Sequence, residues 1–199
     1  MSSKGVGTRD RILDTAFRLA ARDGLEGLSL GDIAGQLRMS KSGLFAHFRS
    51  KEELQIDLLR TGAARFVEKV LLPAFRRPRG LPRLKQIFAG WMRWANDPAL
   101  PGGCVMMAAA IELDDREGPV REALVALQKE LLAALARSAE IAIEEGHLRR
   151  RLDVEQFAFE LYAILLGFNH AQRLLRDPQA EKRARGAFAR LLASARAAD

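Results

Sequence analysis

The chain has little of what a secreted, membrane-spanning or disulfide-bonded protein needs. A single cysteine, Cys104, excludes an intramolecular disulfide and suits a reducing compartment. Its apolar neighbours favour a buried, inert thiol over a redox sensor. No apolar run approaches the ~20 residues of a membrane span, and residues 1 to 8 are short, polar and glycine-containing, unlike a signal peptide. These absences predict a cytoplasmic protein without a membrane partner.

The sequence also lacks the clusters that catalysis or metal binding requires. Its three histidines, His47, His147 and His170, are far apart and show no metal-ligand spacing. Two pairs of acidic residues, at 114–115 and 144–145, are adjacent, and adjacent residues of a helix point in different directions. No glycine-rich phosphate loop follows a strand. We therefore expect no enzyme activity, no metal and no cofactor.

What the chain does have is an excess of basic residues. The 32 lysines and arginines outnumber the 25 aspartates and glutamates, which gives a formal net charge of +7. Such an excess favours a polyanionic partner such as nucleic acid. The arginine-rich runs at 76–79, 149–151 and 182–185 are typical of helix ends and solvated faces, so we assign none of them to DNA. With 199 residues, the chain can hold a small N-terminal domain and a larger helical body.

The most informative stretch, residues 29–54, has the sequence SLGDIAGQLRMSKSGLFAHFRSKEEL. Ser29, Ser40 and Ser50 each stand where a side-chain oxygen can cap the N-terminus of a helix. Glu53 completes a capping box with Ser50, because a glutamate three residues after the cap reaches back to the cap's own backbone N–H. Three capped starts within about two dozen residues predict three short elements that meet at angles.

The middle one of these helices has a surface suited to DNA. Its expected exposed residues are Lys41, Ser42, Phe45, Ala46 and His47. Leu44 and Phe48 are kept for the core. A helix-turn-helix needs this arrangement to place one helix in the major groove. The alternative is an ordinary corner of an all-helical domain; Lys41 and His47, which have no obvious core role, favour DNA binding.

Residues 9 to about 58 resemble the N-terminal DNA-binding domain of the tetracycline-repressor (TetR) family of transcriptional regulators. The matching pieces are RILDTAFRLAARDGLEGLSL, DIAGQLRMSKSGLFAHF and SKEEL. The resemblance implies helices at 11–22 and 30–37, and a recognition helix at 41–47. A further helix from residue 51 would link the DNA-binding domain to the regulatory body.

Nine residues are expected to contact DNA. Side chains at the start of the recognition helix meet base edges or phosphates, and those that flank it meet phosphates, which position the protein without reading sequence. Gly43 has no side chain to hold the backbone away from the duplex. The expected DNA-contacting residues are Ser29, Arg38, Ser40, Lys41, Ser42, Gly43, Phe45, His47 and Lys51.

Two of these residues depart from the family's pattern. Phe45 stands where members often carry a tyrosine, so a phosphate-bonding hydroxyl is missing, and the ring either touches a thymine methyl or sugar edge or simply packs. Arg38 stands where the turn often contains a glycine, so it either adopts an uncommon backbone conformation or adds a phosphate contact. Neither departure undoes the fold, but both leave the operator sequence open.

The rest of the chain is predicted to be helical, with no strand candidate. Apolar periodicity, with proline and glycine at the ends, places these helices at 51–75, 81–97, 104–113, 119–145, 153–176 and 178–195. We therefore expect an all-α chain with a three-helix helix-turn-helix DNA-binding domain at residues 1–50. The start of the linking helix, at 51–58, leads into a helical-bundle domain for ligand binding and dimerisation at residues 51–199.

Two of the later helices have apolar faces that favour a dimer. Apolar residues form one stripe after Pro119, and the segment from Phe157 is apolar nearly all round, so it must be buried on every face. The resemblance implies that these two helices pair with their copies in a four-helix interface. The alternative is a purely intramolecular core. The expected interface residues are Leu124, Leu127, Leu131, Leu135, Phe157, Leu161 and Ile164.

A ligand pocket is implied by the resemblance, which places it among the middle helices of the body. Both tryptophans and a pair of methionines favour an adaptable apolar cavity for a hydrophobic or aromatic molecule. The alternative is that these residues form ordinary core. Asn169 and His170 are the polar pair best suited to orient a ligand. The expected pocket residues are Phe88, Trp91, Met92, Trp94, Met106, Met107, Tyr162, Phe168, Asn169 and His170.

The sequence thus predicts a homodimer that binds double-stranded DNA. By the resemblance, it represses transcription from a palindromic operator and is released when a small-molecule effector fills the body. The competing prediction is a helical protein-interaction module, which would dimerise without salt-dependent binding to DNA.

Overall fold

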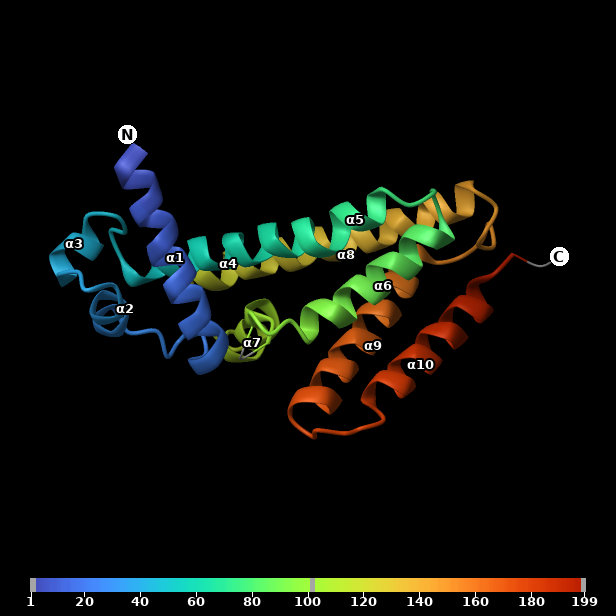
Figure 1. Cartoon of the computed structure of the whole chain (residues 1–199). Coiled ribbons are helices and arrows are strands. Elements are labelled where there is room, and N and C mark those ends of the chain that lie inside the picture. The colour runs from blue at the N-terminus through green and yellow to red at the C-terminus, as the bar shows by residue number, and fades with distance from the viewer. Residues whose placement is uncertain (1–2, 101–102, 198–199) are drawn as a thin grey trace. The chain divides into compact units, whose positions relative to one another are not determined.

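The computed structural model describes residues 3–100 and 103–197, with side chains from residue 7 onward. Within these ranges the regular secondary structure is helical and contains no strand (Figure 1), so the predicted all-α fold class is confirmed. The helical elements are α1 (Ser3–Asp23), α2 (Leu30–Leu37), α3 (Lys41–Phe45), α4 (Lys51–Phe66), η1 (Val67–Leu71), α5 (Leu72–Phe75), α6 (Leu81–Ala95), α7 (Val105–Glu112), α8 (Pro119–Glu144), α9 (Val154–Arg173) and α10 (Ala180–Ala195).

By packing, the chain divides into two compact units. Unit 1 comprises Met1–Arg65 and Asn96–Leu127, and unit 2 comprises Phe66–Ala95 and Gln128–Asp199. The expected domain boundary at residue 50 concerns function and stays a prediction. In terms of packing, α7 and the start of α8 group with the N-terminal helices, although they lie far from them in sequence.

Unit 1 is built around the apolar face of α1. Ile12 and Phe17 on this helix are fully buried, as are Leu44 and Phe48 from the region of α3. Removing each such side chain from water contributes about 1.5–3 kcal/mol, which is why helices as short as α2 and α3 hold their positions. These short helices depend on tertiary packing, because isolated helices of this length are marginal in water.

Unit 2 has an aromatic core. The rings of Phe88 on α6 and Phe188 on α10 stack at 4.1 Å with an interplanar angle of 11°. Phe66 meets the edge of Trp91 at 4.7 Å between ring centroids. The helices α9 and α10 pack along each other (Figure 1), and α6 packs against α9. These contacts fix the aromatic side chains of α6 within the unit.

The structure differs from the predicted single helix over 51–75 in the second half of that range. Between α4 and α5, the five residues Val67–Leu71 form a π-helical segment, η1. Such segments are rare inside α-helices and often mark functional sites. Val70 lies against Gly90 of α6, where an added β-carbon would be 3.3 Å from the valine methyl Cγ1. The wider, π-helical turn therefore lies where the backbone of α6 packs closely against η1.

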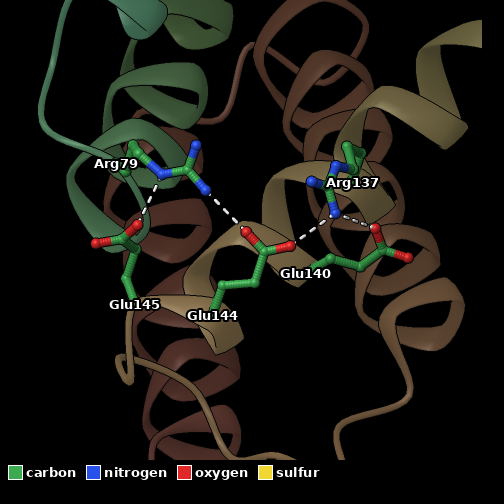
Figure 2. A network of polar contacts seen from close by, with 5 residues as sticks. All are labelled: Arg79, Arg137, Glu140, Glu144 and Glu145. Carbon is green, nitrogen blue, oxygen red and sulfur yellow. Dashed lines mark hydrogen bonds and ion pairs between the residues drawn. The ribbon is translucent and has the colours of Figure 1, made fainter.

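A network of exposed ion pairs joins the loop before α6 to the end of α8. Arg79 donates to Glu145 at 2.7 Å and to Glu144 at 2.8 Å, and Arg137 donates to Glu144 at 2.9 Å and to Glu140 at 2.8 Å (Figure 2). The hydrogen bond to Glu140 is the largest cause that raises the pKa of Arg137. The carboxylates of Glu144 and Glu145 thus accept hydrogen bonds from arginine side chains.

Several predicted helix ends differ from the structure. The first helix begins at Ser3 instead of residue 11, and α6 ends at Ala95 instead of residue 97. The recognition helix ends at Phe45 instead of residue 47, because the N–H of His47 turns to the carbonyl of Leu44, three residues back. The helix expected to reach residue 176 ends at Arg173, and Arg176 adopts a left-handed conformation with φ of 51°. The last helix begins at Ala180, after Asp177 has accepted the N–H of Gln179.

Candidate DNA-binding site

The turn between α2 and α3 is set by the backbone of Arg38. This residue has φ of 52° and ψ of 41°, which is the left-handed region that non-glycine residues rarely adopt. The next N–H, of Met39, donates to the carbonyl of Ala34 at 2.9 Å and so satisfies a helix-terminal acceptor. Of the two alternatives left open for Arg38, the uncommon backbone is therefore present, and the exposed side chain is available for a phosphate contact.

The first helix of the pair starts at the predicted serine cap. Ser29 Oγ accepts from the N–H of Asp32 at 3.4 Å, and the backbone of Ser29 is extended. Ile33 and Ala34 are buried, which holds α2 against α1. The predicted bounds of this helix, 30–37, are confirmed.

The start of α3 is capped in the same way. Ser40 Oγ accepts from the N–H of Gly43 at 3.0 Å and lies 3.0 Å from Ser42 Oγ. A β-carbon at residue 43 would be 3.2 Å from Ser40 Oγ, so the glycine leaves room for this cap. Leu44 points inward and is fully buried. The helix is thereby held with its N-terminal end at the surface.

The surface of α3 is polar at one end and aromatic at the other. Lys41 and Ser42 are exposed, and Phe45 is 46 % exposed. The stem of Lys41 lies over the first turn of α2, since a β-carbon at Gly31 would be 3.5 Å from its Cε atom. The exposed phenylalanine ring is free to contact an apolar group, and His47 is half-buried.

The start of α4 carries the predicted serine cap, but Glu53 reaches back to the N–H of Arg49 instead of that of Ser50. Ser50 Oγ accepts from the N–H of Glu53 at 3.1 Å, and the carboxylate of Glu53 accepts from the N–H of Arg49 at 2.8 Å. Lys51, which is expected to contact a phosphate, also has a structural partner. Its ammonium donates to the carbonyl of Glu26 at 2.8 Å, which leaves two of its three N–H groups for other acceptors.

Several other basic residues of unit 1 already have carboxylate partners. Arg9 pairs with Asp57 and lies 4.6 Å from the ring centre of Phe48. Arg65 pairs with Asp14 in the same way. At the end of α1, a hydrogen bond between the side chains of Arg22 and Asp23 raises the pKa of the guanidinium and lowers that of the carboxyl. These charges brace the fold, so the unpaired positive charge of the site comes from α3 and its flanks.

A polar joint around residues 24–26 was not foreseen from the sequence. The carboxylate of Glu112, at the end of α7, accepts from the N–H groups of Leu25 at 3.2 Å and Glu26 at 2.8 Å. The carbonyl of Leu25 accepts from the buried amide of Gln55 at 3.0 Å. This short loop is therefore held by both α4 and α7. A lone glutamate at a helix end gives no sequence signal for such a contact.

The expected ligand-pocket residues divide between the two units. In unit 2, Phe88, Trp91, Met92, Trp94 and Phe168 are buried, Tyr162 and Asn169 are half-buried, and His170 is exposed. In unit 1, Met106 is half-buried and Met107 is buried. Whether they line a pocket stays a prediction.

Three buried polar atoms in unit 2 lack hydrogen-bond partners among the described residues. They are Nε1 of Trp91, Nε1 of Trp94 and Oδ1 of Asn169. Buried polar groups in proteins are nearly always paired, so each such atom calls for an explanation. All three belong to residues expected to line the ligand pocket.

The predicted dimer interface stays a prediction, and its residues differ in exposure within the single chain. Leu124 is 4 % exposed in the single chain, and Leu135, Phe157 and Leu161 are 0–1 % exposed. Their side chains pack in the core of the single chain. Leu127, Leu131 and Ile164 are half-buried. Large apolar side chains at the surface of unit 2 lie elsewhere, among them Phe159 and Leu166 on α9.

The described part of the chain contains neither a cluster of metal-binding side chains nor a membrane-spanning helix. Residues 3–100 and 103–197 contain no group of three or more histidine, cysteine or acidic side chains that could hold a metal ion. None of the helices in these ranges is long and apolar enough to cross a membrane.

Two family models match the chain, and together they cover most of it. Residues 12–58 match the model described as bacterial regulatory proteins, tetR family. Residues 80–188, more than half of the chain, match the model described as tetracyclin repressor-like, C-terminal domain.

Individual proteins are similar as well. The HTH-type transcriptional repressor AcnR of Corynebacterium efficiens is 37 % identical over 67 residues, which are 34 % of this chain and 36 % of that protein. The chain thus matches only about a third of that relative's length.

Solved structures align over nearly the whole chain. A TetR transcriptional regulator from Chloroflexus aurantiacus superimposes with a TM-score of 0.87 at 24 % identity, covering 99 % of this chain and 100 % of that one. AibR, solved in complex with isovaleryl coenzyme A and operator DNA, gives a TM-score of 0.74 at 25 % identity and covers 92 % and 97 %. The chain belongs to the tetR family of bacterial regulatory proteins, as its sequence led us to expect.

Proposed function

We propose that the chain is a homodimeric repressor that occupies a palindromic operator and leaves it when a small molecule binds to the regulatory part of the protein. The observation that carries this proposal is the capped α2–α3 pair, whose exposed start of α3 carries Lys41 and Ser42. Repression is supported by the similarity of about a third of the chain to AcnR, which is named as a repressor.

In this proposal, α3 enters the major groove with its N-terminal end. Lys41 and Ser42 contact base edges or phosphates, and the lack of a side chain at Gly43 lets the backbone approach the duplex. Ser29, Arg38, Ser40, Phe45, His47 and Lys51 contact phosphate, sugar or thymine methyl groups around this helix. The phosphate contacts position the protein and make its affinity depend on salt.

The second copy is proposed to cover α9 and α10. A mainly apolar groove runs between these helices, lined by Phe159, Ala163, Ile164, Ala187 and Leu191, together with Glu160, Arg190 and Ser194. Phe159, which lines this groove, is 63 % exposed in the single chain, and an exposed apolar surface of this kind marks an interaction site. A two-fold axis would bring the same two helices of each copy together. This proposal keeps α9 from the predicted four-helix interface and takes α10 in place of α8.

The effector is proposed to act by shifting a conformational equilibrium. It must bind the DNA-incompetent arrangement more tightly than the competent one, because equal binding to both would shift nothing. AibR, a similar protein that was solved with both a small molecule and operator DNA, supports the two kinds of partner in this proposal. We also propose that the chain has no enzyme activity and works in the cytoplasm.

The test is a selection of bound duplexes from a fragmented-DNA pool with the full chain, at two salt concentrations. We expect enrichment of a two-fold symmetric site whose half-sites lie about one helical turn apart. Unselective binding that merely weakens with salt would contradict the proposal and favour a helical protein-interaction module, in which the DNA senses only the basic charge.

A further inference from the structure

The two tryptophans of the chain, Trp91 and Trp94, each have a buried N–H group that lacks a hydrogen-bond acceptor within the part of the chain that the structure describes. Both belong to α6, are 2 % and 4 % exposed, and bury an indole N–H that has no acceptor among the described residues. An indole N–H can only donate. A molecule that satisfies these groups must therefore offer acceptor atoms.

The two indoles belong to one aromatic cluster. Phe66 meets the edges of Trp91 at 4.7 Å and of Trp94 at 5.9 Å, and Tyr162 of α9 lies 5.9 Å from Trp91 between ring centroids. The hydroxyl of Tyr162 donates to Gln128 Oε1 at 2.8 Å. The side chains around the two indoles are thus aromatic rings, and the hydroxyl of the tyrosine already has a hydrogen-bond acceptor.

Asn169, in contrast, has a buried acceptor atom that lacks a hydrogen-bond donor within the described ranges. It follows Tyr162 by seven residues on α9, so both side chains lie on the same face of the helix, two turns apart. Its buried Oδ1 atom has no donor among the described residues. A molecule along this face would complete the pairing if it also carried an O–H or N–H group.

The charge of the surroundings limits the molecule further. Among the described residues, the buried polar side chains are Thr15, Gln55 and Ser138, none of which carries a charge. Lys69 lies 5.7 Å from the ring centre of Trp94, but it is exposed. An enclosed carboxylate or ammonium group would have no buried counter-charge, and burying an unpaired charge is very costly.

We propose that the effector is an uncharged, largely apolar molecule whose carbonyl or other acceptor oxygen takes the indole N–H groups of Trp91 and Trp94. An O–H or N–H group of the same molecule donates to Asn169. This inference rests on the proposed function, because it names the chemical class of the small molecule that the regulator responds to.

The test uses probes matched in shape but not in chemistry. Equilibrium dialysis of the full chain would compare cyclohexanone, cyclohexane and cyclohexanecarboxylate, and then 2-adamantanone, adamantane and adamantane-1-carboxylate. We expect one ketone to bind about tenfold more tightly than its hydrocarbon and its carboxylate, as the pairing of a buried donor predicts. Ketone binding should also change the tryptophan fluorescence.

Variants connect this preference to the indole groups. Trp91→Phe with Trp94→Phe keeps two aromatic rings but removes both N–H groups, so the ketone should lose its advantage while hydrocarbon binding persists. Ser138→Ala is the control, because it removes a buried hydroxyl of unit 2 that donates to the carbonyl of Ala134 and does not belong to the aromatic cluster. That variant should keep the full preference, and circular dichroism would verify that each variant is folded.

The outcomes are separable from those of the DNA selection. Failure of every ketone to bind better than its hydrocarbon, tightest binding of a carboxylate, or an unchanged preference in the double variant would each overturn this inference. If the same preparation still selects a symmetric operator, the proposed function stands and only the effector class is wrong. If the ketone binds as expected but no operator is selected, the proposed function fails instead.

Discussion

The backbone of Gly24 passes so close to the carboxylate of Glu112 that a β-carbon at residue 24 would lie 2.6 Å from Oε1. The two residues are far apart in sequence but belong to the same unit. Gly24 has φ of 84°, which turns the chain after α1 so that the next two N–H groups reach this carboxylate. The glycine is thus required both by its backbone conformation and by the space it leaves.

Gly24→Ala should lower the free energy of unfolding by about 1–3 kcal/mol, because the methyl group clashes and the backbone is strained. Urea unfolding followed by circular dichroism measures this change. Gly35→Ala is the matched control: a β-carbon there has open space, and the residue lies within α2. That variant should gain up to about 1 kcal/mol. A neutral result for Gly24→Ala would contradict the described joint.

Arg38→Gly should change stability and DNA affinity in opposite directions. Glycine accepts the left-handed backbone of the α2–α3 turn without strain, so the free energy of unfolding should rise by up to about 1 kcal/mol. Loss of the guanidinium should weaken operator binding and lower the salt slope by about one. Urea unfolding and a salt titration of DNA binding test the two parts. An unchanged slope would remove Arg38 from the phosphate contacts.

Lys51→Ala should weaken binding to every duplex and lower the salt slope by about one, as expected for a phosphate contact. It should also cost about 1 kcal/mol of unfolding free energy, because the ammonium donates to the carbonyl of Glu26. Lys182→Ala removes an exposed lysine of α10 and should change neither quantity. A stability loss with an unchanged slope would show that Lys51 has only its structural role.

Phe159→Arg should separate the dimer, because it places a charge in the apolar groove between α9 and α10. Sedimentation velocity should then show a single-chain species, and operator affinity should fall with it. Leu175→Arg is matched in exposure, at 62 % against 63 %, but residue 175 does not line that groove. If Phe159→Arg remains a dimer, the interface lies elsewhere.

The sequence predicted best those features that depend on neighbouring residues. The bounds of α2 and the caps at Ser29, Ser40 and Ser50 are confirmed, since each cap requires only a side chain and an N–H three residues away. The left-handed backbone of Arg38 was one of two alternatives, and local sequence alone could not choose between them.

Features that depend on distant residues were predicted less well. Apolar periodicity shows that Leu135 and Phe157 are buried, but not whether the chain itself or a second copy covers them. The joint at Glu112 connects residues almost ninety positions apart, so no local pattern indicates it. The unpaired indole groups of Trp91 and Trp94 likewise became visible only once their surroundings were known.

The π-helical turn at Val67–Leu71 gives the long helical region from α4 to α5 an unusual tolerance to changes in length. A π-helical turn holds one residue more than the α-helical turn it replaces. Deleting a single residue there can be absorbed by a return to regular α-helix, with the preceding and following faces still in phase. The same deletion within α4 would rotate every later residue by about 100°. Single-residue deletions in natural variants should therefore gather in this turn.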